Sequence, residues 1–124
     1  MLALVILALL LPIGTSAPSG IGTSADDGCL CHGEKNSDTS ILVTGLPDFF
    51  ESNTTYNFSI ELTSENIPME SGKPVGGFRL LISDGMISFD EEEGLIQPED
   101  GGWTHTEAGN TWRMWNFSFT SPLD

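Results

Sequence analysis

Two stretches of this chain place an apolar side chain at every second position, and this alternation constrains the fold more than any other feature. Apolar and polar side chains alternate through residues 56–62, and residues 115–119 repeat the pattern with Trp115, Phe117 and Phe119 on one face. A period of two is typical of a strand with one face in a core. No stretch after residue 17 combines a 3.6-residue period with helix caps. We therefore expect an all-β fold, an antiparallel sandwich or barrel.

Three shorter runs predict further strands, at residues 40–44, 78–82 and 86–89. Asp84-Gly85 separates the last two runs, and Asp-Gly between apolar runs predicts a hairpin with a type I′ turn. The pattern thus gives five or six strands, whereas a sandwich of this type usually has about seven. The sequence stops directly after its last strong strand. We expect the domain to be incomplete at its C-terminus, or to take a missing strand from a partner.

The N-terminal residues 1–17 are typical of a signal peptide. The first 13 residues are apolar and uncharged, which is too short for a membrane span of about 20 residues but suits the apolar region of an export signal. The small residues Thr15 and Ala17 then occupy the -3 and -1 positions of a cleavage after Ala17. No Lys or Arg precedes the apolar run, which is a departure from the usual signal. We expect the mature chain to be extracytoplasmic, either secreted or at the cell surface.

Three Asn-x-Ser/Thr sequons follow, at Asn53, Asn57 and Asn116. The alternation places Asn57 and Asn116 on the outward faces of their strands. All three asparagines are therefore candidate glycosylation sites on an exposed surface.

The charge balance excludes one large class of function. The chain has 18 Asp and Glu against 4 Lys and Arg, for a formal net charge of -14. Nucleic-acid binding requires clustered Lys and Arg to neutralise phosphates, so we expect no nucleic-acid partner.

The motifs of serine hydrolases, zinc peptidases and phosphate-binding loops are absent from the sequence. We expect a protein that is not an enzyme.

Six short landmarks, taken in order, resemble a known family. They are Gly28-Cys29-Leu30-Cys31-His32-Gly33, Val43-Thr44-Gly45-Leu46-Pro47, Thr55-Tyr56-Asn57-Phe58-Ser59-Ile60, Gly77-Phe78-Arg79-Leu80, Thr104-His105-Thr106 and Trp115-Asn116-Phe117-Ser118-Phe119-Thr120-Ser121-Pro122. The order is similar to that of the reeler-like domain, and closer to its exported prokaryotic version, the choice-of-anchor V domain, over roughly residues 27–122.

That resemblance implies an immunoglobulin-like β-sandwich at residues 40–124. The small, polar and Gly-rich residues 18–28 predict that the lead before it, residues 18–39 with the cysteine cluster, is flexible. It also implies an exported surface protein, with further strands after the last one here. A C-terminal anchor often follows in this family. We therefore expect contact with a membrane only through an anchor that is not present in this chain.

The cluster Cys29-Leu30-Cys31-His32 is the most chemically specific feature of the sequence. Many proteins of the resembled family carry Cys-x-x-Cys-His here, the attachment motif of haem c. The spacing in this chain is one residue shorter.

Four interpretations of this cluster remain open. In the first, Cys29 and Cys31 form a disulfide, the usual outcome for paired cysteines in an oxidising compartment. In the second, the two cysteines attach haem c, with His32 as the proximal ligand and His105 as a candidate sixth ligand. In the third, they bind zinc or copper together with His32 and His105, and in the fourth they crosslink two molecules. His105 itself is either such a ligand or a histidine whose ring is merely hydrogen bonded.

The leading functional hypothesis is a non-catalytic, exported β-sandwich module of a cell-surface protein, for adhesion or ligand binding. Its partner would be an unidentified surface ligand or a neighbouring domain of the same protein. The alternatives are an extracellular electron carrier with haem c and a surface protein that binds a transition metal.

Overall fold

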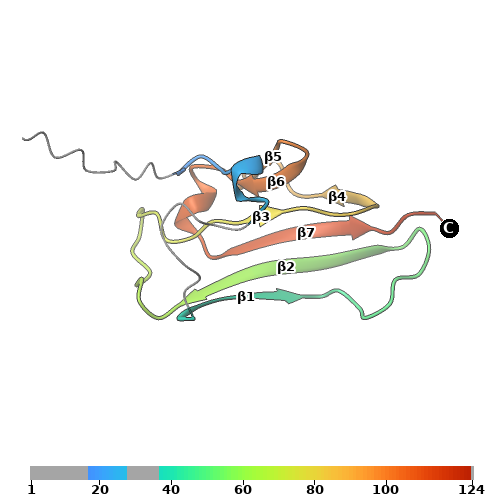
Figure 1. Ribbon diagram of the computed structural model, residues 1–124, viewed down its shortest axis with the longest axis horizontal. Helices are drawn as coiled ribbons and strands as arrows, with labels where there is room; N and C mark the ends of the chain where they lie inside the picture. Colours follow the sequence, from blue (N-terminus) through green and yellow to red (C-terminus); the bar gives the residue numbers. More distant parts are fainter. Residues whose placement is uncertain (1–16, 28–36, 124) are drawn as a thin grey trace, which may run out of the picture.

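A computed structural model gives the structure of the protein, and it describes residues 17–27 and 37–123. The described part is an all-β fold of two antiparallel sheets (Figure 1). Two short 3-10 helices, η1 (Thr23–Ala25) and η2 (Gly109–Thr111), accompany the strands. The strands are β1 (Thr39–Thr44), β2 (Thr55–Ser64), β3 (Arg79–Leu80), β4 (Met86–Ser88), β5 (Ile96–Glu99), β6 (Gly102–His105) and β7 (Met114–Thr120).

The larger sheet has the strand order β1-β2-β7-β4. Its two long central strands, β2 and β7, contain the alternating stretches of the sequence, and their register pairs Phe58 with Phe117 and Ile60 with Trp115. These four side chains are all buried. The predicted facing of the two stretches is therefore confirmed, because one face of each strand enters the core and the other faces solvent.

The smaller sheet has the strand order β3-β6-β5. The alternation of apolar residues did not predict two of these strands, β5 and β6. β5 contains Pro98, which lacks a backbone donor but is tolerated because β5 is an edge strand. β5 and β6 form a tight hairpin whose central residues, Asp100 and Gly101, have φ of 46° and 75°. Positive φ at both positions is what a type I′ turn requires.

The hairpin predicted at Asp84-Gly85 is wrong. β3 lies in the smaller sheet, whereas β4 pairs with β7 in the larger one, so the turn carries the chain from one sheet to the other. Of Asp84 and Gly85, only Gly85 has a positive φ, which is 92°. The glycine is needed for close packing, since a Cβ there would lie 2.5 Å from the Phe119 ring.

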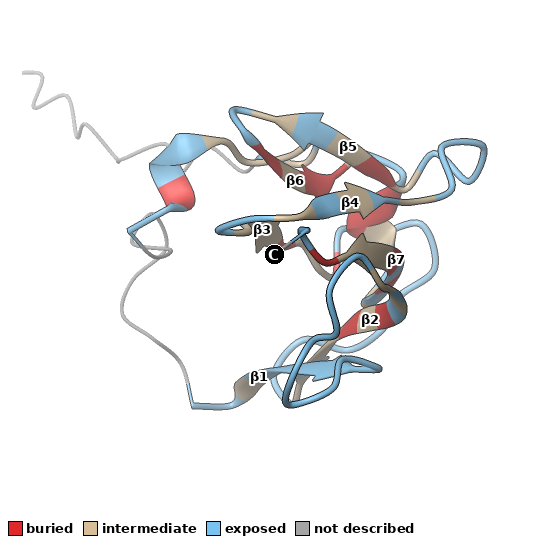
Figure 2. Cartoon of the chain, turned by 90° about the vertical axis from the view of Figure 1, so that its right-hand side faces the viewer, coloured by how far each residue is buried: buried red, intermediate tan, exposed pale blue. Residues whose placement is uncertain are grey.

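The core lies between the two sheets and is centred on aromatic rings. Phe78, the residue before β3, packs into this core, with its ring centroid 4.8 Å from that of Trp115 and 5.5 Å from that of Phe117. Trp115 is only 1% exposed, and its indole N–H donates to the carbonyl of Gly109 at 3.2 Å. Figure 2 shows the buried segments concentrated along β2, β6 and β7, whereas β1 is mostly exposed.

Within the described ranges, no helix is long and apolar enough to cross a membrane.

Candidate functional site

Of the four residues expected to bind haem or a metal, the structure places one. Cys29, Cys31 and His32 lie outside the described residues, and His105 is the last residue of β6. In residues 17–27 and 37–123, no group of three or more His, Cys, Asp or Glu side chains is arranged to hold a metal ion.

His105 is 5% exposed, and both ring nitrogens are hydrogen bonded to the backbone. The backbone N–H of Phe78 donates to Nδ1 at 3.2 Å, so the proton of the neutral ring is on Nε2. Nε2 in turn lies 3.2 Å from the carbonyl oxygen of Ala17. A metal ion or haem iron at Nε2 would have to replace this bond. Ala17 is the residue after which the predicted signal peptide ends, so cleavage there removes this carbonyl.

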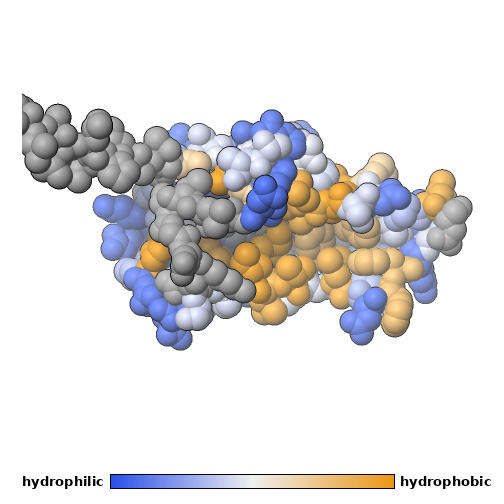
Figure 3. Space-filling model, viewed as in Figure 1, coloured by the Kyte–Doolittle hydropathy of each residue, from blue (hydrophilic) through white to orange (hydrophobic). Residues whose placement is uncertain are grey.

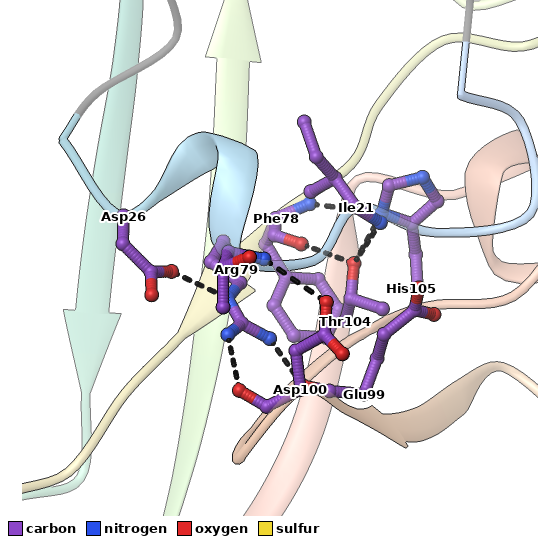
Figure 4. Close-up of polar contacts among 9 residues, drawn as sticks. Ile21, Asp26, Phe78, Arg79, Glu99, Asp100, Thr104 and His105 are labelled. Carbon is purple, nitrogen blue, oxygen red and sulfur yellow. Dashed lines mark hydrogen bonds and ion pairs between the residues drawn. The ribbon is translucent and has the colours of Figure 1, made fainter.

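Thr104, the neighbour of His105, connects three parts of the chain (Figure 4). Its side chain is fully buried, and its hydroxyl donates to the carbonyl of Phe78 at 2.7 Å. The same hydroxyl accepts the backbone N–H of Ile21 at 3.1 Å. One side chain therefore joins β6, the residue before β3 and the N-terminal segment.

Arg79 makes a second connection to this segment (Figure 4). Its Nε lies 2.9 Å from a carboxylate oxygen of Asp26, and its side chain is only 6% exposed. Its other nitrogens donate to the carbonyls of Glu99 and Asp100 at the β5–β6 turn. The described part of the predicted flexible lead, residues 18–27, is thus bound to the smaller sheet through Ile21 and Asp26.

A cavity of about 450 Å³ lies beside His105. The described residues that line it include Ile21, Ile41, Phe78 and Asn110. Asn110 is 9% exposed, and its side-chain oxygen Oδ1 is buried with no hydrogen-bond partner among the described residues. An unpaired buried acceptor is costly and uncommon in native proteins. The cavity is therefore lined mostly by apolar residues, and one of its polar lining residues, Asn110, has a buried acceptor that is unsatisfied within the described residues.

A larger feature is an apolar face that the sequence analysis did not identify. Ile41 and Val43 pair with Leu62 and Ile60 of β2, so they lie on the core-facing side of the larger sheet. They are nevertheless 62% and 49% exposed. Figure 3 shows apolar surface gathered in the middle of the face that it views.

Part of this face is hollowed into a groove of about 350 Å³. We call it the β1–β3 groove, and it lies between β1 and β2 on one side and the β3–β4 segment on the other. Its lining residues are Val43, Leu46, Phe50, Phe58, Ile60, Leu80, Leu81, Ile82, Ser83, Asp84, Ile87 and Phe119. All but two of these are apolar, and Asp84 is the one charged residue among them. The volume is within the range of small-molecule and peptide sites.

The three sequon asparagines are all exposed. Asn57 and Asn116 lie on the outer face of the larger sheet, where both line a shallow polar depression, and the Ser118 hydroxyl donates to Asn57 Oδ1 at 2.7 Å. Asn53 lies in the loop before β2, with φ of 48°. The outer face is thus polar and accessible, whereas the β1–β3 groove opens on the inner face.

Comparisons of this chain with protein-family models, with curated proteins and with solved structures found no match. The resemblance to the reeler-like domain therefore stays an expectation drawn from the six landmarks. The assignment of a site must come from the geometry, which offers the His105 cavity and the β1–β3 groove.

Proposed function

We propose that this chain is a non-catalytic binding module of an exported cell-surface protein, and that it holds its ligand on the inner face of β1. The observation that carries the proposal is the exposure of Ile41 and Val43, two side chains on the core side of a sandwich sheet. Apolar surface of this kind is rarely left open in a monomer and marks an interaction site.

The groove suits adhesion or ligand binding because its walls are apolar and few polar groups interrupt them. Binding there removes apolar surface from water, at about 25 cal/mol for each Å². The signal-like residues 1–17 support export, and the formal net charge of -14 would favour the solubility of an exported chain.

The test is a pair of single substitutions in the producing cell. Val43→Asp places a charge on the inner face, and Leu42→Asp places the same charge on the outer face of the same strand. Val43 is 49% exposed and Leu42 is 55% exposed, so the two substitutions are closely matched in solvent exposure. Antibody staining of intact cells measures export, and attachment of cells to their natural surface measures binding.

We expect equal surface staining for the native chain and both variants, and loss of attachment only for Val43→Asp. Absence of staining on intact cells would contradict export. Equal attachment by both variants, at equal staining, would contradict the assignment of the inner face as the binding surface.

A further inference from the structure

The two sheets differ in width, and this difference explains the β1–β3 groove. The larger sheet has four strands and the smaller sheet has three. Phe58 and Ile60 of β2 are buried, whereas the neighbouring β1 residues on the same face are open. The smaller sheet thus ends at β3, before it reaches over β1. In Figure 2 the two sheets separate on the side where β3 and β1 are the outermost strands.

The boundary of the smaller sheet also has unused hydrogen-bonding groups. β3 is an edge strand of only two residues, and the chain continues through Leu81, Ile82 and Ser83 along the groove. Within the described part of the chain, the backbone groups of these three residues form no hydrogen bond. An unpaired edge beside an apolar groove is a template for another strand.

We propose that an extended segment of a partner protein adds to this edge as a fourth strand of the smaller sheet. Its backbone would pair with β3 and residues 81–83, and every second side chain would point toward the exposed inner face of β1 at Val43. This mode of recognition takes affinity from main-chain hydrogen bonds and specificity from alternate side-chain pockets. The inference rests on the proposed function, because it specifies how the inner face holds its ligand.

Charge decides which chain supplies the strand. A second copy would bring another formal charge of -14, so self-association is opposed by repulsion between like charges. Two of the four cations, Arg79 and Arg113, already bond to backbone carbonyls of their own domain. The partner segment that suits this protein therefore alternates apolar and polar residues and carries Lys or Arg at its ends.

The probe is a synthetic peptide of about nine residues, the length of a strand, in which valine and threonine alternate between lysine ends. A second peptide has the same sequence with alternate backbone nitrogens methylated, which removes hydrogen bonds on one edge and keeps the side chains. A third replaces the terminal lysines by glutamate. Binding of each peptide to the purified chain is measured by fluorescence anisotropy.

We expect the first peptide to bind, and methylation to weaken it at least about tenfold through the loss of several hydrogen bonds. Val43→Asp should weaken it by about 10- to 100-fold, because the contact of one apolar side chain is lost. Leu42→Asp should change it by less than about twofold, the effect expected for a charge on the far side of the sheet. The glutamate-ended peptide should bind more weakly than the lysine-ended one.

Three results would overturn strand addition by a partner. Equal binding of the methylated peptide would show capture by apolar contacts alone, and the inner face would remain the binding surface. Equal binding by both aspartate variants would move the site away from the inner face and would contradict the proposed function as well. A dimer in sedimentation, abolished by Val43→Asp alone, would assign the face to a second copy. Melting curves of both variants show that each is folded.

Discussion

Thr104→Val tests whether one buried hydroxyl fastens the N-terminal segment to the sandwich. The two side chains have nearly the same shape, so the change removes the hydroxyl and leaves the packing in place. The native hydroxyl donates to the Phe78 carbonyl at 2.7 Å and accepts from Ile21 N–H at 3.1 Å. Both of these backbone groups lose their partner in the variant.

The expected cost follows from the burial of these groups. Thr104 is fully buried, and its bond to Phe78 is buried, whereas its bond to Ile21 is only partly buried. A buried polar group that loses its partner costs about 1–3 kcal/mol. The full value for Phe78 and the low end for Ile21 give a loss of about 2–4 kcal/mol in the free energy of unfolding. For a domain of this size the melting temperature falls by at least about 8 °C.

Urea unfolding followed by tryptophan fluorescence measures this loss, because Trp115 is in the core. The matched control is Thr44→Val, whose hydroxyl shares a 2.8 Å hydrogen bond with Ser59 at an exposed site. The control should cost less than about 0.5 kcal/mol, as surface substitutions do. If Thr104→Val unfolded at the same urea concentration as the control, the two hydrogen bonds of this hydroxyl would not contribute the stability assigned to them here.

Four further predictions test the core, the turn, the surface and the cysteine cluster. Phe58→Asp should unfold the domain, because it buries an unpaired charge beside the stacked ring of Phe117 at a cost of several kcal/mol. A native-like melting curve would contradict the placement of Phe58 in the core. Gly101→Ala should cost about 1 kcal/mol in urea unfolding, because φ of 75° strains a side chain although the surrounding space is open; no loss would argue against the type I′ turn. Asn57→Gln, made in a glycosylating host, should remove one glycan by mass and leave the melting temperature unchanged, and collapse of the fold would contradict the exposure of this residue. The intact mass of the mature chain should be two hydrogens below the mass of its reduced form, as a disulfide between the two cysteines requires. A gain in mass of one haem that survives denaturation would instead make the chain an electron carrier.

The sequence predicts the parts of this fold in which local pattern and tertiary packing agree. The alternation in residues 56–62 and 115–119 specifies β2 and β7, and both central strands follow it. Two of the Asp-Gly pairs, at residues 84–85 and 100–101, lie between strands of the described structure, and the packing around each pair decides what it forms. At Asp100-Gly101 both residues take positive φ and close a hairpin, whereas at Asp84-Gly85 the demand for close packing on β7 redirects the chain. A dipeptide alone does not distinguish these two outcomes.

The candidate site was harder to predict than the core. Ile41 and Val43 have the pattern of core residues, and only the widths of the two sheets show that nothing in the described part of the chain covers them. The sequence singled out His105 for its chemistry, but its bonds to Phe78 and Ala17 depend on contacts 27 and 88 residues apart along the chain. Such long-range contacts leave no local pattern. The one local signal of this face is the alternation of Ile41 and Val43 with polar or outward residues, and that signal does not distinguish an open face from a covered one.

Hydrogen exchange of the backbone amides at Leu81, Ile82 and Ser83, in the free protein and at saturation with the lysine-ended peptide, shows whether a strand adds to this edge. These amides form no hydrogen bond in the described structure, so they should exchange quickly in the free protein. With the peptide bound, strand pairing predicts slower exchange at alternate amides of this segment. At the peptide concentration that saturates the native chain, the slowing should be much smaller in Val43→Asp and equal to the native slowing in Leu42→Asp. Fast exchange at all three amides of the native chain, with the peptide bound, would contradict the account.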